Sequence, residues 1–179
     1  MKTCKRWVHR ASVALSAVLL SAALGLSGCS YYSFSGASIP SNLETIAIPL
    51  VVDNSISPVP TLGRDLTDLL SDRFVGRTRL SLTTNESNAD ALLSVRITRY
   101  TNEPRGVTGD ERASVNRVTV RAEARYIDQT NNEELLDRSV SGFGDYDPVD
   151  DGLDGERVAA QQALERLADD LFSAATSNW

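Results

Sequence analysis

The sequence predicts an α+β fold, in which a four- to five-stranded, mostly antiparallel (mixed) sheet carries two helices packed on one face. Residues 117–127 alternate apolar and polar side chains, which is typical of a strand with one buried and one solvated face. Residues 62–74 and 156–175 each place apolar side chains at helical spacing. One apolar sheet face and two apolar helix stripes can bury each other in two layers.

The first 28 residues have the layout of a lipoprotein signal peptide. A basic segment precedes an uncharged, Ala/Leu/Val-rich run over residues 11–26, which ends in the sequence LSGC at residues 26–29. We predict cleavage before Cys29 and acylation of Cys29 on its sulfur and its new amino group. The apolar run is about sixteen residues long, shorter than the roughly 20 that a permanent membrane-spanning helix needs.

The chain after the signal is predicted to hold a tether and one domain. Residues 29–43 are rich in Ser, Tyr and Gly and form the lipidated tether, and residues 44–179 have the size of a single domain. Ser30 follows the anchor directly. An Asp at that position is the best-known signal for retention in the inner membrane, so Ser30 is compatible with export to the outer membrane.

The charge balance and the residue types exclude several kinds of chemistry. The whole chain has a net charge of −6, and without residues 1–28 it keeps 14 positive and 24 negative side chains, a net charge of −10. It then has no Lys, no His and no Cys except Cys29. Histidine bases, Ser-His-Asp triads, cysteine nucleophiles and His/Cys zinc sites are therefore excluded. The acidic balance argues against a general nucleic-acid binder, and we predict no enzymatic activity, no cofactor and no metal.

The first half of the domain is predicted to form a buried strand, a helix and two further strands. Residues 45–52 are apolar and β-branched, with Pro49 near the end of the strand. Thr61 can cap the helix that follows, and Gly76 ends it. The apolar side chains of this helix are Leu62, Leu66, Leu69, Leu70 and Phe74. The remaining segments are strands at 79–83 and 89–100, a turn at 85–88 and a turn-forming loop at 104–110.

The second half is predicted to form a hairpin and a second helix. The strands at 117–127 and 135–146 are joined by a turn at 128–133. Residues 147–155 form an acidic loop whose spacing does not fit an EF-hand calcium loop, so we interpret it as a solvated loop before the helix. The apolar stripe of the second helix is Ala160, Ala163, Leu164, Leu167, Ala168, Leu171, Phe172 and Ala175.

A row of arginines is predicted on the sheet face that the helices leave uncovered. Arg117, Arg121 and Arg125 alternate with the apolar side chains of their strand, and Arg96 joins them if its strand is a neighbour. Guanidinium groups bind phosphate through paired hydrogen bonds, so the row is a candidate site for a ligand or partner. The alternative is that Glu123 and acids on the next strand neutralise the row as ordinary surface ion pairs.

The order of these features resembles the LptE family of lipopolysaccharide-assembly lipoproteins. The resemblance covers residues 29–179. The stretches that carry it after the lipobox are IAIPLV at 46–51, LGRDLTDLLSDRFVGRTRLSL at 62–82, NADALLSVRITRY at 88–100 and ALERLADDLF at 163–172. A long hairpin separates the last two.

The resemblance implies a non-enzymatic lipoprotein of the outer membrane, anchored by its lipid on the periplasmic side. Members of the family plug and support the β-barrel LptD, which inserts lipopolysaccharide into the outer leaflet, and they have been associated with lipopolysaccharide binding through basic residues. The implied partners are an LptD-like barrel, the membrane and lipopolysaccharide. The arginine row would then contact the barrel lumen or lipopolysaccharide phosphates.

Two other functions stay open from the residues alone. A different envelope lipoprotein, such as a cell-wall synthase activator or a secretion-channel component, can open with a similar strand and helix. An envelope hydrolase could use paired carboxylates such as Asp145 and Asp147, which share one side of a strand. Co-purification of a large barrel protein would separate the assembly factor from these alternatives.

Overall fold

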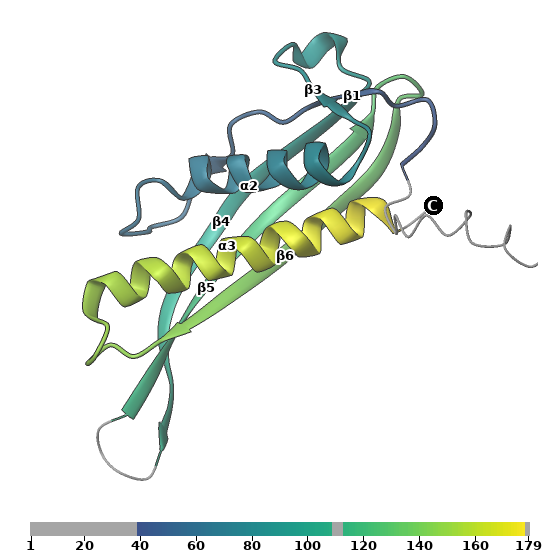
Figure 1. Cartoon of the computed structure of the whole chain (residues 1–179). Coiled ribbons are helices and arrows are strands. Elements are labelled where there is room, and N and C mark those ends of the chain that lie inside the picture. The colour runs from purple at the N-terminus through teal and green to yellow at the C-terminus, as the bar shows by residue number, and fades with distance from the viewer. Residues whose placement is uncertain (1–38, 109–112, 178–179) are drawn as a thin grey trace, which may run out of the picture. The chain divides into compact units, whose positions relative to one another are not determined.

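The computed structural model describes residues 39–108 and 113–177, which form a mixed six-stranded sheet with two helices on one face (Figure 1). The predicted α+β fold is confirmed, with six strands in place of four to five. In chain order the elements are β1 (Thr45–Ala47), β2 (Val52–Asp53), α2 (Leu62–Arg77), β3 (Ser81–Leu82), a 3-10 helix (Glu86–Asn88), β4 (Ala91–Thr108), β5 (Ala113–Asp128), β6 (Glu133–Tyr146) and α3 (Gly152–Thr176).

Three long antiparallel strands dominate the sheet. The strand order is β3-β1-β4-β5-β6, and β2 pairs separately with β4. The short strands β1, β2 and β3 all pair in parallel, whereas β4, β5 and β6 pair antiparallel. Asn132, in the predicted turn between β5 and β6, has a φ of 54°, a left-handed conformation that Asn adopts more readily than most residues.

The hydrophobic core lies between one sheet face and the two helices. The alternating side chains of β5 that the sequence assigns to this face are all buried, and so is the apolar stripe of α3. The ring of Phe74 on α2 lies 5.9 Å from that of Tyr126 on β5 and 5.3 Å from that of Phe172 on α3. These rings join both helices to the sheet at one point.

Helix α3 approaches β6 unusually closely, because β6 presents glycines to it. A Cβ atom on Gly142 would collide with the carbonyl oxygen of Ala163, and one on Gly144 with that of Ala159. Small residues on both elements therefore allow backbone to pack on backbone along the edge of the sheet. Gly142 and Gly144 lie on the same face of β6, and their lack of side chains sets the distance between α3 and the sheet.

Two features of the first half of the domain differ from the prediction. The first strand is divided into β1 and β2, with Pro49 between them. Proline has no N–H group for a sheet ladder, which explains the interruption. Thr61 does occupy the cap position of α2, but its hydroxyl bonds to the Asp65 carboxylate at 2.8 Å and not to the backbone. The helix continues one residue past Gly76.

The loop predicted at 104–110 is wrong for residues 104–108. Strand β4 continues to Thr108, and the pairing with β5 shifts between Pro104 and Gly106 to accommodate the two turn-forming residues. A β-bulge lets the strand continue where a regular ladder would end. At the other end of the domain, α3 begins at Gly152, inside the predicted acidic loop.

The segment that enters the domain is held by side chains from distant elements. Leu43 is fully buried, and the guanidinium of Arg79 donates to the backbone carbonyls of Ile39, Pro40 and Leu43. The Asp90 carboxylate accepts hydrogen bonds from the backbone N–H groups of Glu44 and Thr45 at 3.0 and 2.9 Å. These bonds lower the pKa of Asp90 and join the start of β1 to the start of β4.

Candidate functional site

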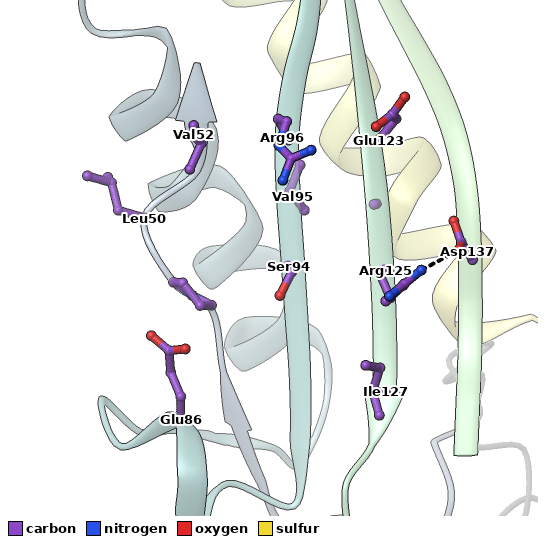
Figure 2. A pocket seen from close by; sticks show the side chains of 12 residues that line it. Leu50, Val52, Glu86, Ser94, Val95, Arg96, Glu123, Arg125, Ile127 and Asp137 are labelled. Atoms are coloured by element: carbon purple, nitrogen blue, oxygen red, sulfur yellow. Dashed lines mark hydrogen bonds and ion pairs between the residues drawn. The ribbon is translucent and has the colours of Figure 1, made fainter. Parts of the chain in front are cut away.

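The sheet face opposite the helices is the surface on which the predicted arginines lie, and we call it the open face. Figure 2 shows this side, with the helices behind the strands. Among the described residues, no helix covers it. The side chains that form it are Ser94, Arg96, Arg99, Thr101 and Glu103 of β4, Arg117, Thr119, Arg121, Glu123 and Arg125 of β5, and Asp137, Ser139, Ser141, Phe143 and Asp145 of β6.

Two of the four predicted arginines are neutralised by acids on the neighbouring strand. Arg117 donates two hydrogen bonds to Asp145, at 2.6 and 2.7 Å, and these bonds lower the pKa of the Asp145 carboxyl group. Arg125 forms ion pairs with Asp137 at 3.1 Å and Glu134 at 3.2 Å, the first of which is drawn in Figure 2. For Arg117 and Arg125, the interpretation as surface ion pairs is therefore correct.

The other two predicted arginines differ from this pair. Within residues 39–108 and 113–177, no ion pair and no side-chain hydrogen bond engages Arg96 or Arg121, and both are exposed. The backbone of Arg96 pairs with Glu123 of β5, but their side chains form no ion pair. The structure therefore divides the row into neutralised ends and an unpaired middle.

Arg99 is a fifth arginine on the open face, and alternation along its strand does not predict it there. Simple alternation from Arg96 would point Arg99 toward the helices. A bulge at Thr98 shifts the register between Ile97 and Arg99, so Arg99 faces Arg121 across the ladder. In the sequence, this shift is indicated by Ile97 and Tyr100, two large apolar side chains three positions apart where regular alternation would separate them by an even number.

A shallow hollow adjoins this unpaired middle. It has a volume of about 570 Å³ and lies between the loop before β2 and strands β4 and β5. Leu50, Val52 and Ile127 contribute apolar surface to it (Figure 2). Its charged side chains have both signs, with two arginines, Arg96 and Arg125, and three acids, Glu86, Glu123 and Asp137. The exposed fractions of Leu50 and Val52 are 68% and 53%, so this apolar surface faces solvent in the free chain.

The other end of the open face carries a stacked aromatic ring. The guanidinium carbons of Arg117 and Arg166 lie 4.0 and 4.3 Å from the ring centre of Phe143. Arg166 comes from α3 and reaches around the edge of β6, where it also donates to the Phe143 carbonyl oxygen at 2.8 Å. The two guanidinium groups can lie this close to one ring because the π electrons of Phe143 attract both of them and its carbonyl oxygen also attracts Arg166.

The carboxylates considered for hydrolysis are engaged in structural contacts. Asp145 binds Arg117, and Asp147 accepts hydrogen bonds from the backbone N–H groups of Val149 at 2.8 Å and Asp150 at 3.2 Å. In the part of the chain that the structure describes, no group of three His, Cys, Asp or Glu side chains is placed to hold a metal ion. No helix in the same residues is long and apolar enough to cross a membrane. Cys29 lies outside the described residues.

A known structure shares this fold. Protein XCC0632 from Xanthomonas campestris superposes with a TM-score of 0.53 at 12% identity, over 76% of this chain and 88% of that one. The PelC dodecamer subunit from Paraburkholderia phytofirmans gives a TM-score of 0.49 at 14% identity, over 78% of this chain and 94% of that one. A comparison with curated protein sequences finds no match.

A family comparison gives the more specific result. The LptE model, described as lipopolysaccharide-assembly, matches residues 43–175. This match extends from the buried Leu43 to the last turn of α3 and so includes every strand and both helices of the described domain. The chain therefore belongs to the LptE lipopolysaccharide-assembly family.

Proposed function

We propose that this protein is an outer-membrane lipoprotein that acts as a non-enzymatic assembly factor, and that it binds and plugs an LptD-type β-barrel for lipopolysaccharide transport and insertion. The observation that carries the proposal is the match to the LptE family over nearly the whole described domain. The lipid on Cys29 anchors the domain at the periplasmic side of the membrane. The barrel is the principal partner, and lipopolysaccharide is a further one.

The geometry of the domain supports a binding role. Helices bury one side of the sheet, while the open face presents arginines, hydroxyl groups and a hollow lined by both apolar and charged side chains to solvent. An exposed face that mixes charged, polar and apolar groups is suited to a protein interface with a polar rim. The carboxylates that could have served an acid–base reaction are held by Arg117 and by backbone N–H groups.

Depletion of the protein tests this proposal in the cell. If the proposal is correct, newly made lipopolysaccharide fails to reach the cell surface, and the folded barrel partner decreases in amount because its plug is missing. Re-expression of the wild-type chain restores both. Normal surface lipopolysaccharide and a normal barrel after full depletion would contradict the proposal and favour a different envelope lipoprotein on the same scaffold.

A further inference from the structure

A bulge in β4 places two arginines directly opposite each other at the centre of the open face. Arg99 and Arg121 are register partners, and the extra residue Thr98 makes this alignment possible. The Thr98 hydroxyl donates to the backbone carbonyl of Arg121 at 3.3 Å, which joins the bulge to the neighbouring strand. Cβ atoms of facing residues are roughly 4.5–5.5 Å apart, so the two guanidinium groups share one region of the surface.

This arrangement is unfavourable for the free chain. Like charges directly opposite each other on a sheet repel. On the third strand, β6 places Asp145 beside Arg117 and Asp137 beside Arg125, but it places Ser141 beside Arg121. The ladder rows of Arg117 and Arg125 therefore each contain an acid on β6, whereas the row that pairs Arg99 with Arg121 contains none.

Arg96 extends the pair to a cluster of three. It is a diagonal neighbour of Arg121, because its own register partner Glu123 lies two residues farther along β5. Diagonal neighbours lie about 7–8 Å apart, within reach of long side chains. The two ladder rows that contain these arginines are Arg99–Arg121–Ser141 and Arg96–Glu123–Ser139. Glu123 is the only acid in them, so the three arginines leave an excess of positive charge.

The chemistry of the cluster indicates what it binds. The open face already shows an arginine fork on a carboxylate, since Arg117 holds both oxygens of Asp145. The register partners and β-strand neighbours of Arg99 and Arg121 include the hydroxyls of Thr101, Thr119 and Ser141, which can hydrogen-bond to polar partner groups. A surface with carboxylates at matching spacing complements this cluster in charge and in hydrogen bonding.

We propose that Arg96, Arg99 and Arg121 form the docking site for carboxylate side chains on the wall of the partner barrel. This inference rests on the proposed function, because the barrel is the partner. Binding removes the repulsion between Arg99 and Arg121 and supplies the acids that β6 lacks in this row. The cluster thereby sets the orientation in which the open face meets the barrel.

The test compares the wild-type chain with the Arg99→Gln/Arg121→Gln variant in binding to the purified barrel protein in detergent. Its control is Arg64→Gln/Arg138→Gln, which makes the same change in net charge at exposed positions on α2 and on the helix side of β6. Melting curves confirm first that both variants fold. We expect the open-face variant to bind roughly tenfold more weakly or worse, with a smaller salt dependence, and the control to bind normally.

Three outcomes overturn the inference in distinguishable ways. If the wild-type chain binds the barrel and the open-face variant binds equally well, the cluster is not the docking site. If the variant keeps the barrel but loses binding to lipopolysaccharide micelles, the arginines bind lipid phosphates and not protein carboxylates. If the wild-type chain itself does not bind the barrel, the proposed function fails and this inference fails with it.

Discussion

Gly144 of β6 lies against the backbone of Ala159 in α3, so closely that no side chain fits between them. Gly142 has the same relationship with Ala163 one helical turn farther along. Together these contacts fix the position of α3 on the edge of the sheet. They also determine how Arg166 reaches around β6 to the ring of Phe143 on the open face.

A Gly144→Ala substitution is expected to destabilise the protein by about 2 kcal/mol or more. The added methyl group collides with backbone atoms of Ala159, which cannot move aside as a flexible side chain can, and overpacking of this kind typically costs 1–3 kcal/mol. The measurement is urea unfolding of the wild-type and variant proteins. A matched control is Gly76→Ala in α2, where a Cβ meets no atom within 4 Å.

The control substitution should have the opposite sign. Gly76 is exposed near the end of a helix, so Ala there should stabilise by roughly 0.5–1 kcal/mol. Equal effects of Gly144→Ala and Gly76→Ala would show that α3 does not lie against β6 as described.

The stabilisation that Asp128 provides should be lost in acid. Burial alone would raise the pKa of its carboxyl group, but hydrogen bonds from Thr130, Asn42 and Asn131 outweigh burial and lower the pKa to about 2. Because this pKa is below the unfolded value of 3.8, the unfolded state binds the proton first as the pH falls. The stabilisation is complete above about pH 5 and is lost between about pH 4 and pH 2, a change of about 2 kcal/mol.

The Asp128→Asn variant isolates this effect. Its stability deficit relative to the wild-type protein should be largest at neutral pH and should shrink by about 1 kcal/mol by pH 3 in urea titrations. Other carboxyl groups with lowered pKa, such as Asp90 and Asp169, are present in both proteins and cancel in the comparison. A deficit that stays constant from pH 6 to pH 3 would refute the assignment.

Removal of the Tyr126 hydroxyl should stabilise the protein. This side chain is fully buried, and its hydroxyl forms no hydrogen bond with any described residue. An unsatisfied buried hydroxyl costs about 1–3 kcal/mol, so Tyr126→Phe should raise the free energy of unfolding by about 1 kcal/mol. Since Phe keeps the ring contact with Phe74, a loss of stability in thermal unfolding would mean that the hydroxyl has a partner.

Cys29→Ala tests the predicted lipid anchor. Each acyl methylene that enters the membrane contributes about 0.8 kcal/mol, so the lipidated chain should stay with the outer membrane. The variant should remain unprocessed or appear in the soluble periplasmic fraction. A variant that is cleaved normally and still fractionates with the outer membrane would rule out Cys29 as the anchor.

Sequence periodicity was sufficient to predict the two layers of the fold, because all the side chains on one face of a strand or helix are buried together. The alternation from Val118 to Tyr126 assigns one face of β5 to the core, and the stripe from Ala160 to Ala175 does the same for α3. Both assignments agree with the structure. They depend on neighbouring side chains along one element, which a single sequence displays directly.

The features that the sequence did not predict arise from contacts between elements. Regular alternation from Arg96 does not place Arg99 on the open face. The spacing of Ile97 and Tyr100 signals an irregularity, and the register of β4 on β5 shows that it is a bulge. Pro104 and Gly106 indicate a turn in isolation, yet pairing with β5 keeps them in a strand. The acids that neutralise Arg117 and Arg125 lie on β6, and only the pairing register identifies them.

Co-purification tests the central claim most directly. The tagged full-length protein is expressed in its own bacterium together with the LptD-type barrel, and the lipidated protein is purified in detergent by affinity and then by size. The proposed function predicts a single complex in which the barrel and this chain remain together through both steps. A lipidated, folded protein that elutes alone, while the barrel elutes elsewhere, would contradict the account.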